Sequence, residues 1–102
     1  MDNNYTDFHN SAFSMTLVAL GFKETVPTYY EQFIHNVVER AQSAITTEGI
    51  VLDESSTEDV MLVAQYAAYL YDNRRKESPM PRSLRYELNN KLFSQKGSVV
   101  NG

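Results

Sequence analysis

His35 is the side chain whose neighbours in the sequence best suit acid–base or metal chemistry. Glu31 lies four residues before it and Glu39 four residues after it, so a helix would place all three on one face. One histidine and two carboxylates suit a divalent metal, although the spacing lacks the Glu-x-x-His motif of di-iron bundles. We favour a solvated helix face carrying mixed polar groups, because a site requires clustered groups with perturbed titration. His9 lies in a polar segment without neighbours to interpret.

Other motifs that support catalysis are missing from the sequence. The chain has no cysteine and only four scattered glycines, which excludes disulfides, thiolate metal sites and Gly-rich phosphate loops. The serines have no paired base in their sequence context. We therefore expect neither an enzyme nor a cofactor or metal.

The length and composition predict one small globular domain over residues 1–102. The hydrophobic fraction is 42%, the charged fraction 22% and the net charge −4 with a pI near 5.0. This acidity argues against broad, non-specific nucleic-acid binding. The longest apolar-rich stretch, 60–71, falls short of the roughly 20 residues that a membrane span needs. We expect no membrane association.

Apolar periodicity predicts four helices and no strand. Helices two and three should form a long antiparallel pair, and helix three should be central because it is apolar on two sides. Helix four should begin near Pro81, since proline suits the first helical position. We expect an ordered core over about 11–93, a flexible N-terminal arm over 1–10 and a mobile tail over 94–102. The predicted helices run over 11–20, from a cap at 28 to about 47 or 48, from 59 to about 75, and from about 81 to about 93.

Capping motifs mark the starts of two helices. Thr28 and Glu31 form one predicted capping box, and Ser55 and Glu58 form another. Gly21 occupies the position after the first helix where a left-handed residue is favoured. The second helix should end just before Gly49.

Seven tyrosines make the chain rich in a residue that suits both cores and interfaces. Tyr71 is assigned to the core. Tyr66 and Tyr69 suit either an internal core or a subunit interface, and both interpretations stay open.

The two halves of the chain carry opposite charge. Residues 1–60 hold ten acidic and two basic residues, whereas residues 61–102 hold three acidic and seven basic ones. The charges could compensate within one monomer. They also suit a head-to-tail contact between copies, which makes a ring if it closes. The candidate interface residues on the basic side are Arg74, Arg75, Lys76, Arg82 and Arg85.

Two consecutive segments carry a resemblance to a known family. A helix ending in Ala-Gln-Tyr-Ala-Ala-Tyr-Leu-Tyr-Asp-Asn-Arg-Arg (64–75) precedes Ser-Pro-Met-Pro-Arg-Ser-Leu-Arg-Tyr-Glu-Leu (78–88). This order resembles the head–tail connector (head-completion or adaptor) proteins of long-tailed double-stranded DNA phages. Tyr71-x-x-Arg74, a proline loop, Leu84 and Leu88 carry the match. The short first helix, the striped second helix and the length also fit.

The resemblance implies an all-α subunit that forms a ring, typically twelve-fold, under the portal protein of the capsid. The ring would extend the DNA channel and present a docking surface to the tail or a stopper protein. Genomic DNA would pass through without sequence-specific binding. The expected location is the virion, with the host cytoplasm during assembly, including as a prophage product.

Two alternatives remain open at this level. A small helical DNA-binding regulator would use the basic C-terminal half, in which the same five basic residues could face phosphates and replacement of Arg82 or Arg85 should weaken DNA binding. The Pro-Met-Pro linker, however, is unlike the turn of a helix-turn-helix. A general protein-interaction domain is the other alternative.

Overall fold

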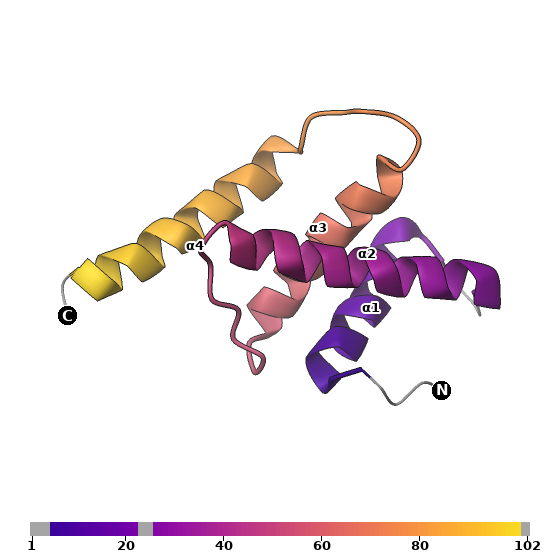
Figure 1. The fold of residues 1–102 in the computed structure, drawn as a ribbon, viewed down its shortest axis with the longest axis horizontal. Helices are drawn as coiled ribbons and strands as arrows, with labels where there is room; N and C mark the ends of the chain where they lie inside the picture. Colours follow the sequence, from indigo (N-terminus) through magenta and orange to yellow (C-terminus); the bar gives the residue numbers. More distant parts are fainter. Residues whose placement is uncertain (1–4, 23–25, 101–102) are drawn as a thin grey trace.

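Four helices connected by short loops make up the fold, and no strand occurs in the ranges described, residues 5–22 and 26–100 of a computed structural model. Figure 1 shows α3 at the centre, with α1 and α2 packed against it and α4 extending to one side. The predicted all-α, four-helix architecture is confirmed. The helices are α1 (Asp7–Leu20), α2 (Thr28–Thr47), α3 (Thr57–Asp72) and α4 (Arg82–Val100).

Helix α1 begins at Asp7, four residues earlier than expected. The Thr6 side chain caps the helix by accepting a 3.0 Å hydrogen bond from the His9 backbone N–H. Phe8 and His9 are buried in this added turn, so the loose arm predicted through residue 10 is wrong for residues 7–10. Residues 1–4 lie outside the described residues. Gly21 ends the helix at φ 88°, as predicted.

Helix α2 carries the apolar stripe that spacings of three and four residues predict over 30–45, except that Tyr30 at its start is 39% exposed. Its buried stripe residues are Ile34, Val37, Val38, Ala41 and Ile45. The Thr28–Glu31 capping box is wrong, because Thr28 is already helical and the Pro27 carbonyl accepts hydrogen bonds from the next turn. The helix ends at Thr47, before Gly49 at φ 102°, as expected.

Helix α3 is shifted toward the N-terminus relative to the prediction. Ser56 caps it by accepting from the Asp59 N–H, one residue beyond the expected Ser55–Glu58 box. The helix ends at Asp72, so Arg74 lies in the following loop. Helices α2 and α3 pack together as expected, and Figure 1 shows that they cross instead of running side by side. This crossing leaves the other side of α3 for α1.

Helix α4 is anchored by apolar side chains in its first half and by Gln95 in its second half, where the Gln95 amide accepts a 2.9 Å hydrogen bond from the Val51 N–H and donates a 2.8 Å one to the Val51 carbonyl. Leu84 and Leu88 are buried, and Leu92 packs partly against the core. The helix continues to Val100, so the tail predicted from residue 94 is helical up to that point, and residues 101–102 lie outside the described ranges. Among the described residues, the buried apolar core is Phe8, Ala12, Ile34, Val37, Val38, Ala41, Ile45, Ile50, Leu62, Val63, Ala64, Tyr66, Ala67, Tyr71, Leu84 and Leu88.

Candidate interaction surface

The predicted Glu31–His35–Glu39 face does not form a site. His35 is 9% exposed and lies against α1, whereas both glutamates are exposed. The interpretation of His35 as part of a solvated face is therefore wrong: the apolar stripe of α2 is wide enough to include it. Over residues 5–22 and 26–100, no group of three histidine, cysteine or acidic side chains is arranged to hold a metal.

A stack of aromatic rings joins α1 to α2 instead. His35 stacks on Phe13 at 3.9 Å between ring centroids and on Tyr5 at 4.3 Å. His9 stacks on the same Tyr5 at 4.1 Å. Its Nε2 lies 2.8 Å from His35 Nδ1, while its Nδ1 lies 3.3 Å from Gln42 Nε2. Because the Gln42 amide nitrogen can only donate, His9 Nδ1 accepts there and His9 Nε2 donates to His35 Nδ1, an arrangement that fits a neutral His9 ring.

Acidification is expected to destabilise the protein through this pair. Burial, followed by the charge of His35, holds the pKa of His9 below its usual value, and Glu39 opposes the shift only in part. The unfolded chain therefore binds more protons as the pH falls through about 6.5, so stability present above that pH is lost below it. Each unit by which the pKa is lowered is worth about 1.4 kcal/mol.

Urea unfolding between about pH 7.5 and 5.5, above the ordinary carboxylate range, measures this effect. The His9→Gln, His35→Gln double variant is the control, because glutamine does not titrate. A flat profile in the variant is expected. An acid-dependent loss as steep as that of the wild type would remove the histidine pair as its cause.

Arg85 belongs to an ion pair inside the molecule. Its guanidinium binds both carboxylate oxygens of Glu48, at 2.9 and 3.0 Å, and so connects α4 to the end of α2. The hydrogen bond to Glu48 raises the pKa of Arg85 above its usual value. Lys91 likewise lies 2.9 Å from the buried carboxylate of Asp59. Part of the opposite charge of the two halves is therefore compensated within one subunit.

Arg74 is also bound within its own subunit. The guanidinium lies 3.9 Å from the ring centroid of Tyr71 and donates a 2.8 Å hydrogen bond to the Tyr71 carbonyl. Tyr71 is buried, as predicted. Arg74 thus covers the end of α3, where a cation complements the helix dipole.

Arg75, Lys76 and Arg82 remain exposed, and no ion pair in the described part of the chain includes them. Two of these residues lie in the loop between α3 and α4, and Arg82 is the first residue of α4. Of the five basic candidates, these three are the ones whose charge is open to a partner.

The two candidate tyrosines are used within the fold. Tyr66 belongs to the buried core, and its burial, followed by the charge of Glu48, raises the pKa of its hydroxyl. Tyr69 is half-buried and donates a 3.2 Å hydrogen bond to the Ser78 carbonyl, which holds the α3–α4 loop in place. The more exposed tyrosines are Tyr29 and Tyr86, at 82% and 67%. Sequence reasoning missed Tyr29, although its position beside the apolar stripe of α2 was a signal.

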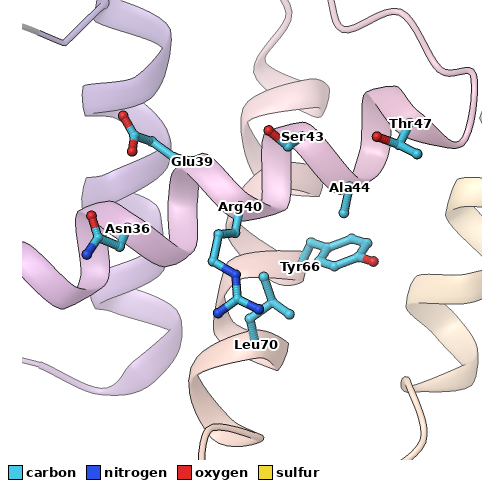
Figure 2. A pocket seen from close by; sticks show the side chains of 8 residues that line it. All are labelled: Asn36, Glu39, Arg40, Ser43, Ala44, Thr47, Tyr66 and Leu70. Atoms are coloured by element: carbon cyan, nitrogen blue, oxygen red, sulfur yellow. The ribbon is translucent and has the colours of Figure 1, made fainter.

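A shallow hollow of about 720 Å³ lies between α2 and α3. Figure 2 shows Arg40 extending from α2 toward Leu70 of α3, with the Tyr66 ring below Ala44. The hollow is a groove between two packed helices, with polar side chains of α2 along its rim.

A second hollow, of about 670 Å³, lies beside the exposed basic loop. It is lined by Tyr29, Tyr30, Phe33, Arg74 and Arg75, together with Gln32 and Asn36. Tyrosine and arginine are the residue types that most often carry binding energy at protein interfaces. We call Tyr29, Tyr30, Arg75 and Lys76 the basic–aromatic patch, and it is the candidate interaction surface.

Comparisons of the chain with family models, curated proteins and solved structures find no match. None of the helices, as far as they are described, is long and apolar enough to cross a membrane. The candidate surface is therefore interpreted from its own residues and geometry.

Proposed function

We propose that this protein is a structural subunit of a phage head–tail connector, which forms a ring under the portal protein. The order of elements carries the proposal: a central helix, a proline loop and a final helix anchored by Leu84 and Leu88. This is the order in the connector family that the sequence resembles. The ring would extend the DNA channel, without sequence-specific binding of DNA, and dock the tail or a stopper protein.

The outer face of α4 supports a docking role. Tyr86 and Phe93 are 67% and 75% exposed and lie seven residues apart, which places them on one face of the helix. Large exposed aromatic side chains on one face are typical of a surface that a partner covers. We assign this face to the portal protein.

Binding to the portal protein from the same genome tests the proposal. We expect the two proteins to sediment together, and the Tyr86→Ser, Phe93→Ser double variant to lose at least about tenfold in affinity. Val18→Ser is the matched control, since Val18 is 67% exposed on α1. A wild-type protein that ignores the portal but binds duplex DNA in a salt-dependent way would instead support a regulator.

That alternative has less support from the basic residues. Of the five basic residues that could face phosphates, Arg85 is bound to Glu48 and Arg74 lies against the Tyr71 ring. Arg75, Lys76 and Arg82 are exposed, and no ion pair in the described ranges includes them. The connector is therefore the stronger proposal.

A further inference from the structure

The two loops that flank α3 lie at opposite ends of the molecule and carry opposite charge. Figure 1 shows the α2–α3 loop below the body and the α3–α4 loop above it. Glu54 in the lower loop and Glu58 in the first turn of α3 are exposed, as are Arg75 and Lys76 in the upper loop. None of these four takes part in an ion pair within the described ranges.

Aromatic surface accompanies the positive charge but not the negative charge. Tyr29 and Tyr30 form an edge-to-face pair with centroids 5.3 Å apart, and both line the hollow that Arg75 also lines. The hollow has apolar walls and an arginine at its rim. An acidic segment with aliphatic side chains suits such a hollow. Its carboxylates can pair with the arginine at the rim, while its aliphatic groups cover the tyrosine rings.

We propose that the basic–aromatic patch of one copy binds the acidic α2–α3 loop of a second copy. Val51, 73% exposed, lies three residues before Glu54 in that loop and supplies the apolar part of the contact. The two surfaces differ and lie at opposite ends, so the contact is heterologous and repeats from copy to copy. This inference rests on the proposed function, which requires such a repeating contact.

A second copy fits the patch better than nucleic acid does. The whole chain carries a net charge of −4, so phosphates would be repelled by most of the molecule. The acidic α2–α3 loop instead offers a surface of complementary charge. Because it belongs to the same chain, it is present at the same concentration as the patch. Complementary charges also orient the approaching copy, because like ends repel each other.

Paired charge reversals test the inference by sedimentation velocity across protein concentration. We expect the wild type to self-associate, whereas Arg75→Glu with Lys76→Glu is monomeric, as is Glu54→Lys with Glu58→Lys. An equimolar mixture of the two double variants should associate again, since each reversed surface then meets its complement. Lys96→Glu, an exposed reversal on α4, should behave as the wild type. Circular dichroism checks that every variant is folded.

Replacement of Tyr29 tests the aromatic part of the contact separately from its charges. Tyr29→Ser should weaken self-association at least about tenfold, as expected for a central aromatic contact. Val18→Ser is the control, because Val18 is 67% exposed on α1 and belongs to neither proposed surface, and it should leave self-association unchanged.

Several outcomes overturn the inference. One is that the wild type stays monomeric up to about 1 mM, a concentration above which any association would be too weak to support the contact. Another is that the double variants associate as the wild type does. A third is that the mixture of the two double variants stays monomeric. Loss of duplex DNA binding on patch reversal, with self-association unchanged, would assign the patch to nucleic acid. Portal binding by a monomeric wild type would overturn only this inference, whereas self-association without portal binding would count against the proposed function alone.

Discussion

Replacement of Asp59 by alanine is expected to lower the free energy of unfolding by about 3 kcal/mol. The side chain is 1% exposed and has partners in two other parts of the fold. One carboxylate oxygen lies 2.9 Å from Lys91 Nζ on α4, and the other accepts a 2.7 Å hydrogen bond from the Asp53 N–H in the α2–α3 loop. The variant leaves both partners without their acceptor.

Urea unfolding followed by circular dichroism measures this loss. Glu58→Ala is the control, because Glu58 is the exposed neighbour in the same helical turn and should cost no more than about 0.5 kcal/mol. The stability of Asp59→Asn should be intermediate. Its amide oxygen can still accept the hydrogen bond from the Asp53 N–H, but the uncharged amide does not neutralise Lys91. Equal stabilities of Asp59→Ala and Glu58→Ala would show that Asp59 does not connect these elements.

Leu88→Ala is expected to cost about 2–5 kcal/mol, the range for a buried leucine whose removal leaves a cavity. Leu88 is fully buried and, with Leu84 at 2% exposure, holds the first half of α4 against the core. Because Leu84 and Leu88 are the buried side chains in the part of α4 whose side chains are described, this loss should also free the helix before the rest of the protein unfolds.

Hydrogen exchange of α4 amides, measured beside urea unfolding, separates the two effects. Phe93→Ala is the control, because its side chain is 75% exposed on the same helix and should change stability by less than about 0.5 kcal/mol. If Leu88→Ala left α4 exchange at the wild-type rate, the anchoring role of this residue would be refuted.

The helices were largely predictable from the sequence because their causes are local. Stripe positions such as Ile34, Val37 and Val38 are buried as their spacing indicated. Gly21 and Gly49 follow helix ends at positive φ, where glycine has the lowest cost. The helix starts were less accurate, since several serines and threonines compete for each cap and tertiary burial selects among them. Thr6 precedes the turn whose Phe8 and His9 become buried.

The candidate surface was only partly predictable. The sequence identified five basic residues but could not separate Arg74 and Arg85, which are bound inside the subunit, from Arg75, Lys76 and Arg82. It also assigned no role to Tyr29, which lies on the candidate surface. Both distinctions depend on which elements approach each other in three dimensions.

Sequence alone determined the all-helical class, the order of the four helices and the opposite charge of the two halves. These properties depend on residue spacing of three or four and on simple composition. Only the tertiary structure decided that His9 contacts His35, that Arg85 pairs with Glu48 across 37 residues, and that Lys91 reaches Asp59. Such contacts arise from the crossing of α2 over α3 and the docking of α1 and α4, which local periodicity does not specify. Burial then selects the pairs, because a polar group removed from water is stable only with a partner.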